Sequence, residues 1–541
     1  MSNTPWSQYP RPLLKRDSYL NLNGNWDFFA ENESFTITVP YPPESQLSGV
    51  DCRFPDGTKL HYKRTFTLPN GFVKDRVLLH FGAVDQKAEV FLNGKTVGTH
   101  VGGYDAFSFD ITDFLQEENL LEVTVADSLR DHILPYGKQV QKPGGMWYTP
   151  VSGIWQTVWL ESVPKRYMKK ITVRTGKNYA EIDVEDENLS GTVTVQTPDG
   201  TVSAKLISGE ATVRLQNPRH WSPADPYLYR FTVEAGEDRA ESYFALRTLT
   251  VEDHRLCLNR KPFFFHAVLD QGYWSDGLFT PQGPEAFEKD IRDMQAMGFN
   301  ALRKHIKVEP QLFYEACDRL GMVVMQDMVN NGDYSFFRDT ALPTVGLQKR
   351  KDKNLHRDET TRKAFLSAME RTVSALYNHP CVCYWTIFNE GWGQFDSQKA
   401  YEMLKKLDAT RIIDTTSGWF RGSDSDVESL HVYFRKFKFK PAKKPTILSE
   451  FGGYCYAVKD HVRNPDKSYG YRNFKEQGAY EDAIVSLYET QIIPAKEKGL
   501  CGAVYTQLSD VEEEINGLVT YDRQVWKVSP ERMKAIANKL K

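Results

Sequence analysis

The chain has 541 residues, enough for about two to four domains, and its 40% hydrophobic content excludes global disorder. Its 68 basic and 71 acidic residues nearly balance, so no overall charge draws it to nucleic acid or to a membrane. We find no signal-peptide run at the start and no spanning segment later, and therefore expect a cytoplasmic protein without a membrane partner. Seven scattered cysteines, an odd number, predict reduced thiols.

The first part of the chain, residues 1–164, is predicted to be a β-sandwich. Short runs such as 88–92 and 121–125 alternate apolar and polar residues, the pattern of strands with one buried face. Turn signals separate these runs, and Asn93-Gly94 is a strong signal for a hairpin.

A second group of short strands follows over residues 165–250. Turn signals divide it at Pro198-Asp199-Gly200 and at Ala235-Gly236-Glu237. The length and the number of strands are typical of an immunoglobulin-like sandwich. Because this segment carries no chemical motif, we assign it a scaffold role.

From residue 251 to residue 541, predicted strands and helices alternate. Residues 284–298 carry apolar side chains at helical spacing and end in a glycine, and residues 311–321 also end in one. Apolar runs typical of strands lie at 299–303 and 322–326. This alternation over about 290 residues predicts a (β/α)8 barrel.

Two of the predicted barrel strands open into a glutamate. The apolar run 381–388 is followed by Asn389-Glu390-Gly391, and the shorter run 446–448 is followed by Ser449 and Glu450. Polar groups at the carboxyl ends of barrel strands are more often catalytic than structural. Two carboxylates at one rim are what glycoside hydrolysis requires.

These motifs resemble glycoside hydrolase family 2, the family of β-galactosidase, β-glucuronidase and β-mannosidase, in which N-E ends one strand and S-E-F-G a later one. Residues 88–112 (AEVFLNGKTVGTHVGGYDAFSFDIT) resemble the family's N-terminal jelly-roll, or sugar-binding, domain. The resemblance covers nearly the whole chain. It implies a jelly-roll domain over 1–164, an immunoglobulin-like β-sandwich over 165–250 and a catalytic TIM barrel over 251–541. It also implies that Glu390 is the acid/base and Glu450 the nucleophile.

The mechanism of such an enzyme needs opposite proton states on the two carboxyl groups. Glu450 must be ionised to attack the anomeric carbon, and the resemblance implies that Arg303 and Tyr433 stabilise its charge. Glu390 must carry a proton for the leaving oxygen, and the nearby negative charge of Glu450 favours that protonated form. Asn389 is expected to bind the sugar 2-hydroxyl.

Other side chains at predicted strand ends complete the expected substrate site: Asp270, His305, His431 and Tyr505. Core histidines bonded to a backbone carbonyl would explain His305 and His431 equally well. Trp392, just past the catalytic loop, is the better sugar platform, because Trp385 lies in mid-strand and belongs to the core.

The loop before the strand QTVWLE departs from the family pattern. In relatives it supplies an aspartate that touches the sugar, whereas here Trp147 stands about where that residue would fall. Trp147 either forms a wall for a sugar ring or packs between domains. Gly144-Gly145, which let the backbone approach closely, favour the wall.

The sequence leaves the identity of the sugar open. The Asn-x-Lys pair of family β-glucuronidases should fall near residues 514–518, and Asn516 is not followed by that lysine. The acidic clusters of metal-dependent β-galactosidases are not evident, so we expect no metal and no cofactor. We take β-galactosidase-like activity as the default, with β-mannoside, β-glucoside and uronide cleavage as alternatives.

Both carboxylates come from fixed strand ends, so we expect them about 5 to 5.5 Å apart, the spacing of a retaining enzyme. The expected function is therefore that of an exo-acting β-glycosidase that works by double displacement. Its expected partner is a carbohydrate, with no nucleic acid, and self-association is left open.

Three other interpretations are weaker. The basic segment 434–444 (FRKFKFKPAKK) is better explained as a solvated barrel loop than as a nucleic-acid site, although its place near the rim leaves open a role with acidic sugars. A non-catalytic carbohydrate-binding protein would lack the two glutamates. A metal hydrolase would need a His/Asp cluster at the strand ends, and none has suitable spacing.

Overall fold

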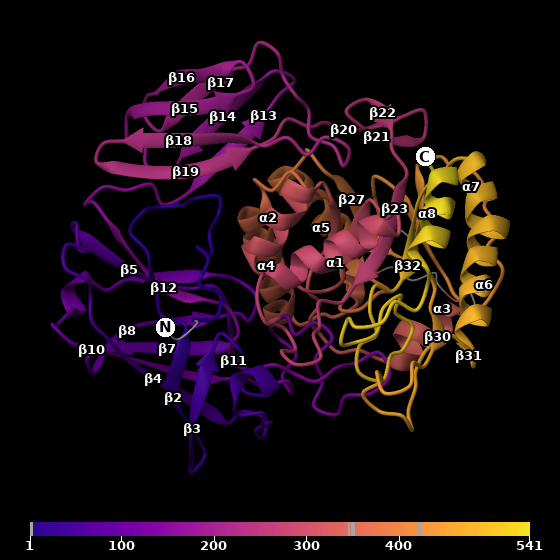
Figure 1. Cartoon of the computed structure of the whole chain (residues 1–541), viewed down its shortest axis with the longest axis horizontal. Coiled ribbons are helices and arrows are strands. Elements are labelled where there is room, and N and C mark those ends of the chain that lie inside the picture. Colours follow the sequence, from indigo (N-terminus) through magenta and orange to yellow (C-terminus); the bar gives the residue numbers. More distant parts are fainter. Residues whose placement is uncertain (1–3, 345–346, 348–351, 419–422) are drawn as a thin grey trace.

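The computed structural model describes residues 4–344, 347, 352–418 and 423–541, and it consists of three bodies (Figure 1). The N-terminal β-sandwich, drawn in indigo and purple, lies beside a second sandwich drawn in magenta, and a (β/α)8 barrel makes up the rest. The fold class predicted from the sequence is confirmed. Within the described ranges, no helix combines the length and the apolar content that crossing a membrane requires.

The N-terminal sandwich packs a six-stranded sheet, β3-β2-β4-β10-β7-β8, against a four-stranded one, β1-β12-β5-β9. Its strands are β1 Leu20–Asn21, β2 Gly24–Ala30, β3 Glu33–Val39, β4 Lys59–Phe66, β5 Arg76–Phe81, β6 Val84–Asp85, β7 Lys87–Leu92, β8 Lys95–Val101, β9 Phe107–Asp110, β10 Asn119–Ala126, β11 Gly153–Ile154 and β12 Val158–Val163. Asn93 and Gly94 join β7 to β8 with φ of 54° and 75°, as expected for the predicted hairpin turn.

The second sandwich pairs the sheets β13-β14-β17 and β16-β15-β18-β19. Its strands are β13 Ile171–Thr175, β14 Tyr179–Val184, β15 Gly191–Thr197, β16 Gly200–Leu206, β17 Glu210–Arg214, β18 Tyr229–Ala235 and β19 Asp238–Phe244. Alternate side chains such as Val193 and Val195 enter its core, because successive residues of a strand point to opposite faces. A small sheet of β20 Leu249–Glu252, β21 Arg255–Leu258 and β22 Lys261–Pro262 leads to the barrel.

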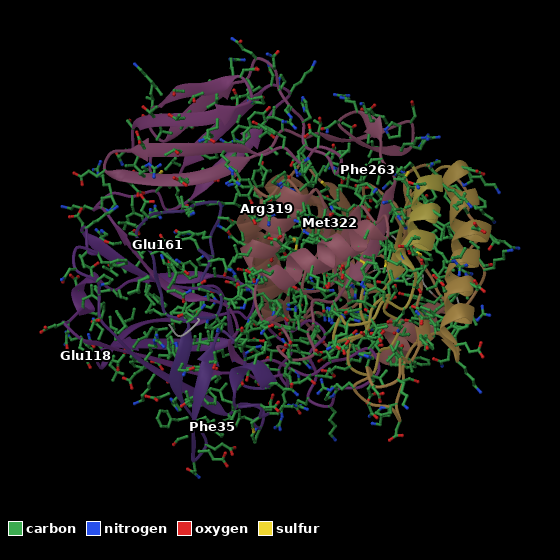
Figure 2. The ribbon with its side chains drawn as sticks, viewed as in Figure 1. Phe35, Glu118, Glu161, Phe263, Arg319 and Met322 are labelled. Atoms are coloured by element: carbon green, nitrogen blue, oxygen red, sulfur yellow. The ribbon has the colours of Figure 1, made fainter. Side chains whose placement is uncertain are left out.

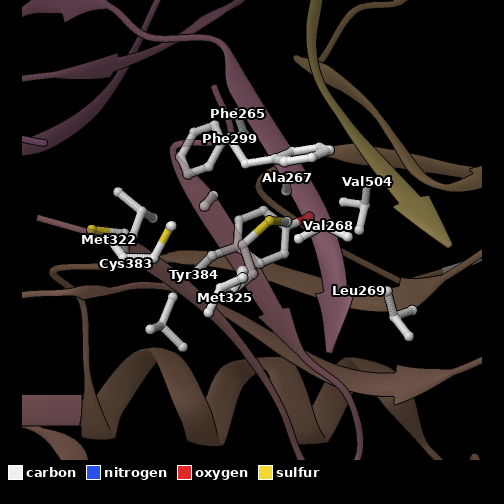
Figure 3. Close-up of a cluster of buried hydrophobic side chains, with 14 of the residues drawn as sticks. Phe265, Ala267, Val268, Leu269, Phe299, Met322, Met325, Cys383, Tyr384 and Val504 are labelled. Atoms are coloured by element: carbon white, nitrogen blue, oxygen red, sulfur yellow. The ribbon is translucent and has the colours of Figure 1, made fainter. Parts of the chain in front are cut away.

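Eight parallel strands form the barrel, in the order β27-β26-β25-β24-β23-β32-β29-β28. They are β23 Phe265–Asp270, β24 Ala301–Lys304, β25 Val323–Asp327, β26 Val382–Asn389, β27 Ile412–Ser417, β28 Glu428–Val432, β29 Thr446–Gly452 and β32 Leu500–Thr506. Every residue of β26 and β29 is buried, because helices cover their outer faces and side chains fill the interior. Figure 3 shows part of this core, where Ala267 of β23, Met325 of β25 and Tyr384 of β26 converge.

Helices and short elements surround these strands: α1 Glu285–Ala296, α2 Gln311–Leu320, η3 Phe336–Ala341, α3 Leu342–Thr344, α4 Glu359–Leu376, α5 Ser397–Leu407, β30 Tyr454–Tyr456, β31 Arg472–Phe474, α6 Gln477–Leu487, η5 Tyr488–Ile492, α7 Ile493–Glu497 and α8 Pro530–Lys539. As predicted, α1 and α2 are followed by glycines with positive φ, Gly298 at 88° and Gly321 at 76°.

Side chains link β27 to β28, the two end strands of the barrel order. Ser429 Oγ donates a hydrogen bond to Asp414 Oδ1 at 2.8 Å, and Ser417 Oγ lies 3.1 Å from His431 Nε2. The strand ends that carry Glu390 and Glu450 are therefore fixed on a nearly closed frame.

We propose 1–164, 165–250 and 251–541 as the domain division, and separate hydrophobic cores support it. The first residues of the chain are an exception, because they run over the other two domains. Leu14 belongs to the core of the second sandwich, and Trp6 packs on Phe287 of the barrel at 5.8 Å.

Ion pairs around Glu161 of β12 and Asp238 of β19 link these first residues to both sandwiches. The Glu161 carboxylate, which is 0% exposed, accepts hydrogen bonds from Arg11 at 2.7 Å and from Arg16 at 3.0 Å. Arg16 also donates to Asp238 of the second sandwich at 2.7 Å. Glu161 lies where the two sandwiches meet (Figure 2).

We expect Glu161 to make the fold sensitive to acid. Burial alone would raise the pKa of Glu161, but Arg11 and Arg16 outweigh it and lower the pKa from 4.5 to about 2. The stability this provides, on the order of 3 kcal/mol, is present above about pH 4.5 and is lost as the pH falls toward about 2. Calorimetry should show Glu161→Gln melting below the wild type near neutral pH, with the difference shrinking through that window. Glu89→Gln, at an exposed site of the same sandwich, is the control. A difference that stays constant with pH would contradict this assignment.

Candidate active site

Glu390 and Glu450 lie together at the carboxyl-end rim of the barrel. Glu390 follows β26 and Glu450 lies near the end of β29, and their exposures are only 9% and 5%. An oxygen of each carboxylate and a ring nitrogen of His431 all lie within 4.8 Å of one another. The structure therefore brings two glutamates, predicted from separate strands, into one site.

The backbone leaves strand geometry abruptly at Glu390. This residue has a φ of 52°, a left-handed conformation that costs free energy for any residue except glycine, and Gly391 follows at 81°. The Glu390 N–H donates to the Ser417 carbonyl of β27 at 2.9 Å and so holds the turn. The turn directs the carboxylate toward His431 across the barrel mouth.

Arg303 of β24, at 0% exposure, joins four strands through its guanidinium. It donates to Glu450 Oε1 at 3.0 Å, to Asn389 Oδ1 at 2.8 Å and to Asp327 Oδ1 at 3.0 Å. Burial disfavours its charge, but Asp327 and Glu450 raise the pKa of Arg303 above its ordinary value. Arg303 therefore stays cationic and fixes the orientation of the Asn389 amide. Asn389 Nδ2 has no hydrogen-bond partner in the described part of the chain.

Tyr433 holds the second oxygen of Glu450. Its hydroxyl donates a hydrogen bond to Glu450 Oε2 and lies 3.0 Å from Thr506 Oγ1 of β32. The Tyr433 ring stacks on Tyr471 at 4.0 Å. Arg303 and Tyr433 therefore hold both oxygens of the Glu450 carboxylate in place.

His431 of β28 lies between the two glutamates. Its Nδ1 is 2.7 Å from Glu390 Oε1 and 3.5 Å from Glu450 Oε2, and its Nε2 is 3.1 Å from Ser417 Oγ. His431 thus contacts the predicted acid/base directly, which a core histidine bonded to a backbone carbonyl would not do.

His305 bonds a carboxylate rather than a backbone carbonyl. Its Nδ1 lies 2.8 Å from Asp327 Oδ2, and its ring faces Trp392 at 6.5 Å. Burial lowers the pKa of His305 to about 4, so the ring is neutral near pH 7 and Nδ1 is the donor. Because Asp327 also bonds Arg303, His305 helps to position the arginine.

Trp392 and Trp147 meet where the barrel contacts the N-terminal sandwich. Their rings stack at 5.2 Å, and Tyr334 packs edge-on at 4.8 Å from Trp147 and 5.5 Å from Trp392. Trp147 is half-buried. Burial raises the pKa of Tyr334 to about 12, and the negative charge of Glu390 contributes to that rise. Trp147 therefore packs between domains and also contributes to an aromatic wall near Glu390.

Hydrogen bonds hold the Trp147 loop on the barrel. The Thr149 N–H donates to Glu512 Oε1 at 3.0 Å, and the Tyr148 hydroxyl donates to Glu514. Further upstream, the Tyr136 N–H donates to the Asn330 carbonyl at 3.1 Å. The N-terminal sandwich thus supplies a fixed part of the barrel mouth.

The same loop brings Lys138, which the sequence did not single out. Lys138 is 6% exposed, and its ammonium lies 4.9 Å from the ring centre of Trp392 and 5.8 Å from that of Tyr148. Burial lowers the pKa of Lys138, while the negative charges around it act in the opposite direction. No sequence signal separates it from exposed loop lysines such as Lys142.

The structure corrects the prediction for Asp270, which does not face the barrel mouth. Lys304 Nζ donates to Asp270 Oδ2 at 2.6 Å and lies 4.4 Å from the ring centre of Phe313 in α2. The preceding residue, Arg303, points into the barrel, so Lys304 and Asp270 point to the helix layer. Strand alternation is the physical reason.

The prediction that Tyr505 lies in the substrate site is also corrected, and strand alternation is again the physical reason. Tyr505 is fully buried and packs against Phe451 at 5.6 Å and against Tyr488 of η5 at 6.4 Å. The next residue, Thr506, is the one that reaches Tyr433 in the site. The side chain that enters the site from this strand therefore lies one position beyond the predicted Tyr505.

The basic segment 434–444 follows β28. Arg435, Lys436 and Lys438 are exposed, whereas Phe437 is buried in the barrel core cluster. Charged side chains in water and an aromatic anchor inside are typical of a solvated loop.

Glu390, His431 and Glu450 are the one group within the described ranges that could ligate a metal ion. Their atoms are already bonded: His431 to Glu390 at 2.7 Å, and Glu450 to Arg303 and Tyr433. A metal-free site therefore stays our prediction.

Three family models match the chain in the order of its domains. Residues 13–164 match the sugar binding domain of glycosyl hydrolases family 2, residues 165–247 match a further model of that family, and residues 249–531 match its TIM barrel domain. The chain belongs to glycoside hydrolase family 2.

Individual relatives are distant. The chain is 25% identical over 508 residues to a β-galactosidase of Thermoanaerobacter pseudethanolicus, covering 84% of this chain and 64% of that one. It spans 60 to 65% of the length of the first curated relatives that it matches. Among solved structures it resembles the β-D-glucuronidase of Dictyoglomus thermophilum, with a TM-score of 0.78 at 20% identity over 98% of this chain and 99% of that one. A β-galacturonidase of Eisenbergiella tayi, bound to galacturonate, gives 0.74 at 18% identity over 99% of both chains. At these identities the structures establish the fold alone.

Proposed function

We propose that this protein is a retaining, exo-acting β-glycosidase, with Glu450 as nucleophile and Glu390 as acid/base. The observation that carries the proposal is the closeness of the two buried carboxylates, whose nearest oxygens lie within 4.8 Å. Retaining glycosidases hold these groups about 5 to 5.5 Å apart, whereas inverting ones need roughly 6.5 to 9.5 Å to admit a water.

In the first step, Glu450 attacks the anomeric carbon as the bond to the leaving oxygen breaks, and Glu390 gives its proton to that oxygen. Arg303 and Tyr433 stabilise the ionised Glu450 before the attack. A protonated Glu390 donates to His431 Nδ1, and His431 Nε2–H then donates to Ser417 Oγ. His431 therefore orients the acid.

In the second step, the sugar ester on Glu450 is hydrolysed. The ionised Glu390 takes a proton from water, the water oxygen bonds the anomeric carbon, and the ester bond to Glu450 breaks. Asn389 Nδ2, which the Arg303 contact leaves available, donates to the sugar 2-hydroxyl. That contact strengthens as the transition state forms.

The N-terminal sandwich closes one side of the barrel mouth through Trp147 and its loop. A mouth closed on one side favours a terminal sugar over an internal one. The residues that do this come from a domain outside the barrel, so the separated barrel should lose its preference for chain ends.

The sugar itself is a hexose or a uronic acid in β linkage. Galactoside cleavage is the default taken from the sequence, and the galactosidase relative supports it. A uronide is the second candidate, because the two solved structures named above are a glucuronidase and a galacturonidase.

Proton NMR of a fresh reaction tests the mechanism. A β-glycoside should first release the β-anomer of the sugar, because two displacements at the anomeric carbon restore its configuration. Mutarotation then adds the α-anomer. An initial α-anomer signal would overturn the retaining mechanism, whichever sugar is the substrate.

A further inference from the structure

Lys138 differs from the other buried lysines of the described ranges, which are Lys304, Lys307 and Lys527. Lys304 donates to Asp270 and Glu309, Lys307 to Glu309 and two backbone carbonyls, and Lys527 to Asp510 and a carbonyl. Lys138 is only 6% exposed, and its ammonium lies over the rings of Tyr148 and Trp392 but makes no hydrogen bond or ion pair to a described residue. Buried charges are normally paired, so an ammonium without an acceptor indicates a ligand.

The backbone holds Lys138 at the barrel mouth. The preceding Gly137 has a φ of 70°, and a Cβ there would lie 3.0 Å from the Ile306 carbonyl oxygen and 2.9 Å from the Tyr104 hydroxyl. The Lys138 carbonyl accepts from the Tyr148 N–H at 3.0 Å. This close contact between the domains fixes where the ammonium lies, and the space allows no larger residue at position 137.

The ammonium reaches the barrel mouth from the N-terminal sandwich, because it lies over the ring of Trp392, two residues past Glu390. The charges of Glu514, Glu450 and Glu390 all act on it, yet none of the three forms an ion pair with it. Glu514 is bonded to the Tyr148 hydroxyl and to Asn516 Nδ2. Three donors of Lys138 therefore remain available near the reacting centre.

We propose that Lys138 binds the carboxylate of a β-linked uronic acid whose anomeric carbon lies at Glu450. This inference rests on the proposed function and names its substrate class. A substrate anion needs a cation with free donors, and Arg303 is already bonded to Asp327, Asn389 and Glu450. In a buried site a carboxylate is a stronger acceptor for an ammonium than a neutral hydroxyl is.

Residues 514–518, where family glucuronidases are expected to carry the lysine of their Asn-x-Lys pair, have no lysine in this chain. Leu518 is fully buried in the barrel core, and Asn516 Oδ1 accepts from Gln507 Nε2 at 2.7 Å. The cation therefore comes from a loop of another domain and not from the barrel.

The test compares 4-nitrophenyl β-D-glucuronide, β-D-galacturonide and β-D-galactoside as substrates. The wild type should cleave one uronide with a kcat/KM at least about 100-fold above that of the galactoside. Lys138→Met should lower kcat/KM for that uronide by about 100-fold or more, and by a much smaller factor for the galactoside. Lys138→Arg should recover part of the loss, and Lys142→Met, an exposed site in the same loop, should leave the ratio unchanged.

Product inhibition gives a second readout that does not depend on turnover. Free glucuronate or galacturonate should inhibit the wild type more strongly than the matching neutral sugar, and Lys138→Met should remove that preference. If Lys138→Met does not fold, the inhibition of the wild type together with the Lys138→Arg variant still tests the proposal.

Two results would overturn it. The first is a wild type that prefers the galactoside. The second is a Lys138→Met variant whose kcat/KM falls equally for the uronide and the galactoside. Either result would mean that Lys138 only balances the charges of the glutamates. In either case the glycosidase proposal would stand. Failure to cleave these three substrates and the matching β-glucoside and β-mannoside, with no effect of Glu450→Ala on any residual rate, would instead reject the proposed function.

Discussion

Replacing the nucleophile, Glu450→Ala, is expected to abolish turnover and leave the fold intact. No covalent sugar ester can form without this carboxylate, so kcat should fall by at least about 10⁴-fold on any aryl β-glycoside that the wild type cleaves. The fold should survive because Arg303, the main partner of Glu450, keeps its bonds to Asp327 and Asn389. Kinetics and thermal melting of the purified variant measure the two outcomes.

Azide distinguishes loss of the nucleophile from general damage. A small anion can enter the space of the missing carboxylate and attack the anomeric carbon, giving an α-glycosyl azide and partial recovery of the rate. Glu497→Ala, an exposed carboxylate at the end of α7, is the matched control and should behave as the wild type does. Near-normal activity of Glu450→Ala would rule out its role as nucleophile.

Removing the acid/base, Glu390→Ala, should give a loss that depends on the leaving group. Natural glycosides and simple alkyl glycosides need a proton on the departing oxygen, so their rates should fall by about 10²- to 10⁴-fold. Aryl glycosides of acidic phenols need little protonation and should lose far less in the first step. A series of phenols of graded acidity would measure this as a steeper dependence of kcat/KM on the leaving-group pKa.

The second step offers an independent check on Glu390. Without the base, water attacks the sugar ester slowly, and azide should replace it to give a β-glycosyl azide. Glu402→Ala, an exposed carboxylate on α5, serves as the control. Equal losses for good and poor leaving groups would argue that Glu390 is not the acid.

The barrel and its two glutamates could be predicted because the signals are local. The run 381–388 consists of apolar and β-branched residues, as is typical of a strand buried on both faces, and the polar residues directly after it are expected at the rim. The same holds for 446–448 and Glu450. Glycines 298 and 321 mark helix ends through a backbone conformation that other residues adopt at a cost.

Whether an individual strand side chain points into the barrel or toward the helices was harder to predict than the strands themselves. Asp270 and Tyr505 stand at the ends of true strands, yet both point to the helix layer, and Thr506 takes the place expected for Tyr505. A shift of one residue in a strand reverses the face, and in a run that is buried on both sides the apolar pattern does not reveal which face is which.

The sequence by itself predicted the β-sandwiches, the barrel and the two glutamates at the barrel rim, because the signals for strands, helix ends and rim residues each lie within a few residues of the chain. The tertiary structure alone decided the contacts between domains: Trp147 on Trp392, and the Lys138 ammonium over the Trp392 ring. These pairs are separated by more than two hundred positions in the chain, and Lys138 is chemically the same as any solvated loop lysine until folding buries it. Burial and the lack of an acceptor are the basis of its proposed role, and both arise only when the N-terminal sandwich packs on the barrel.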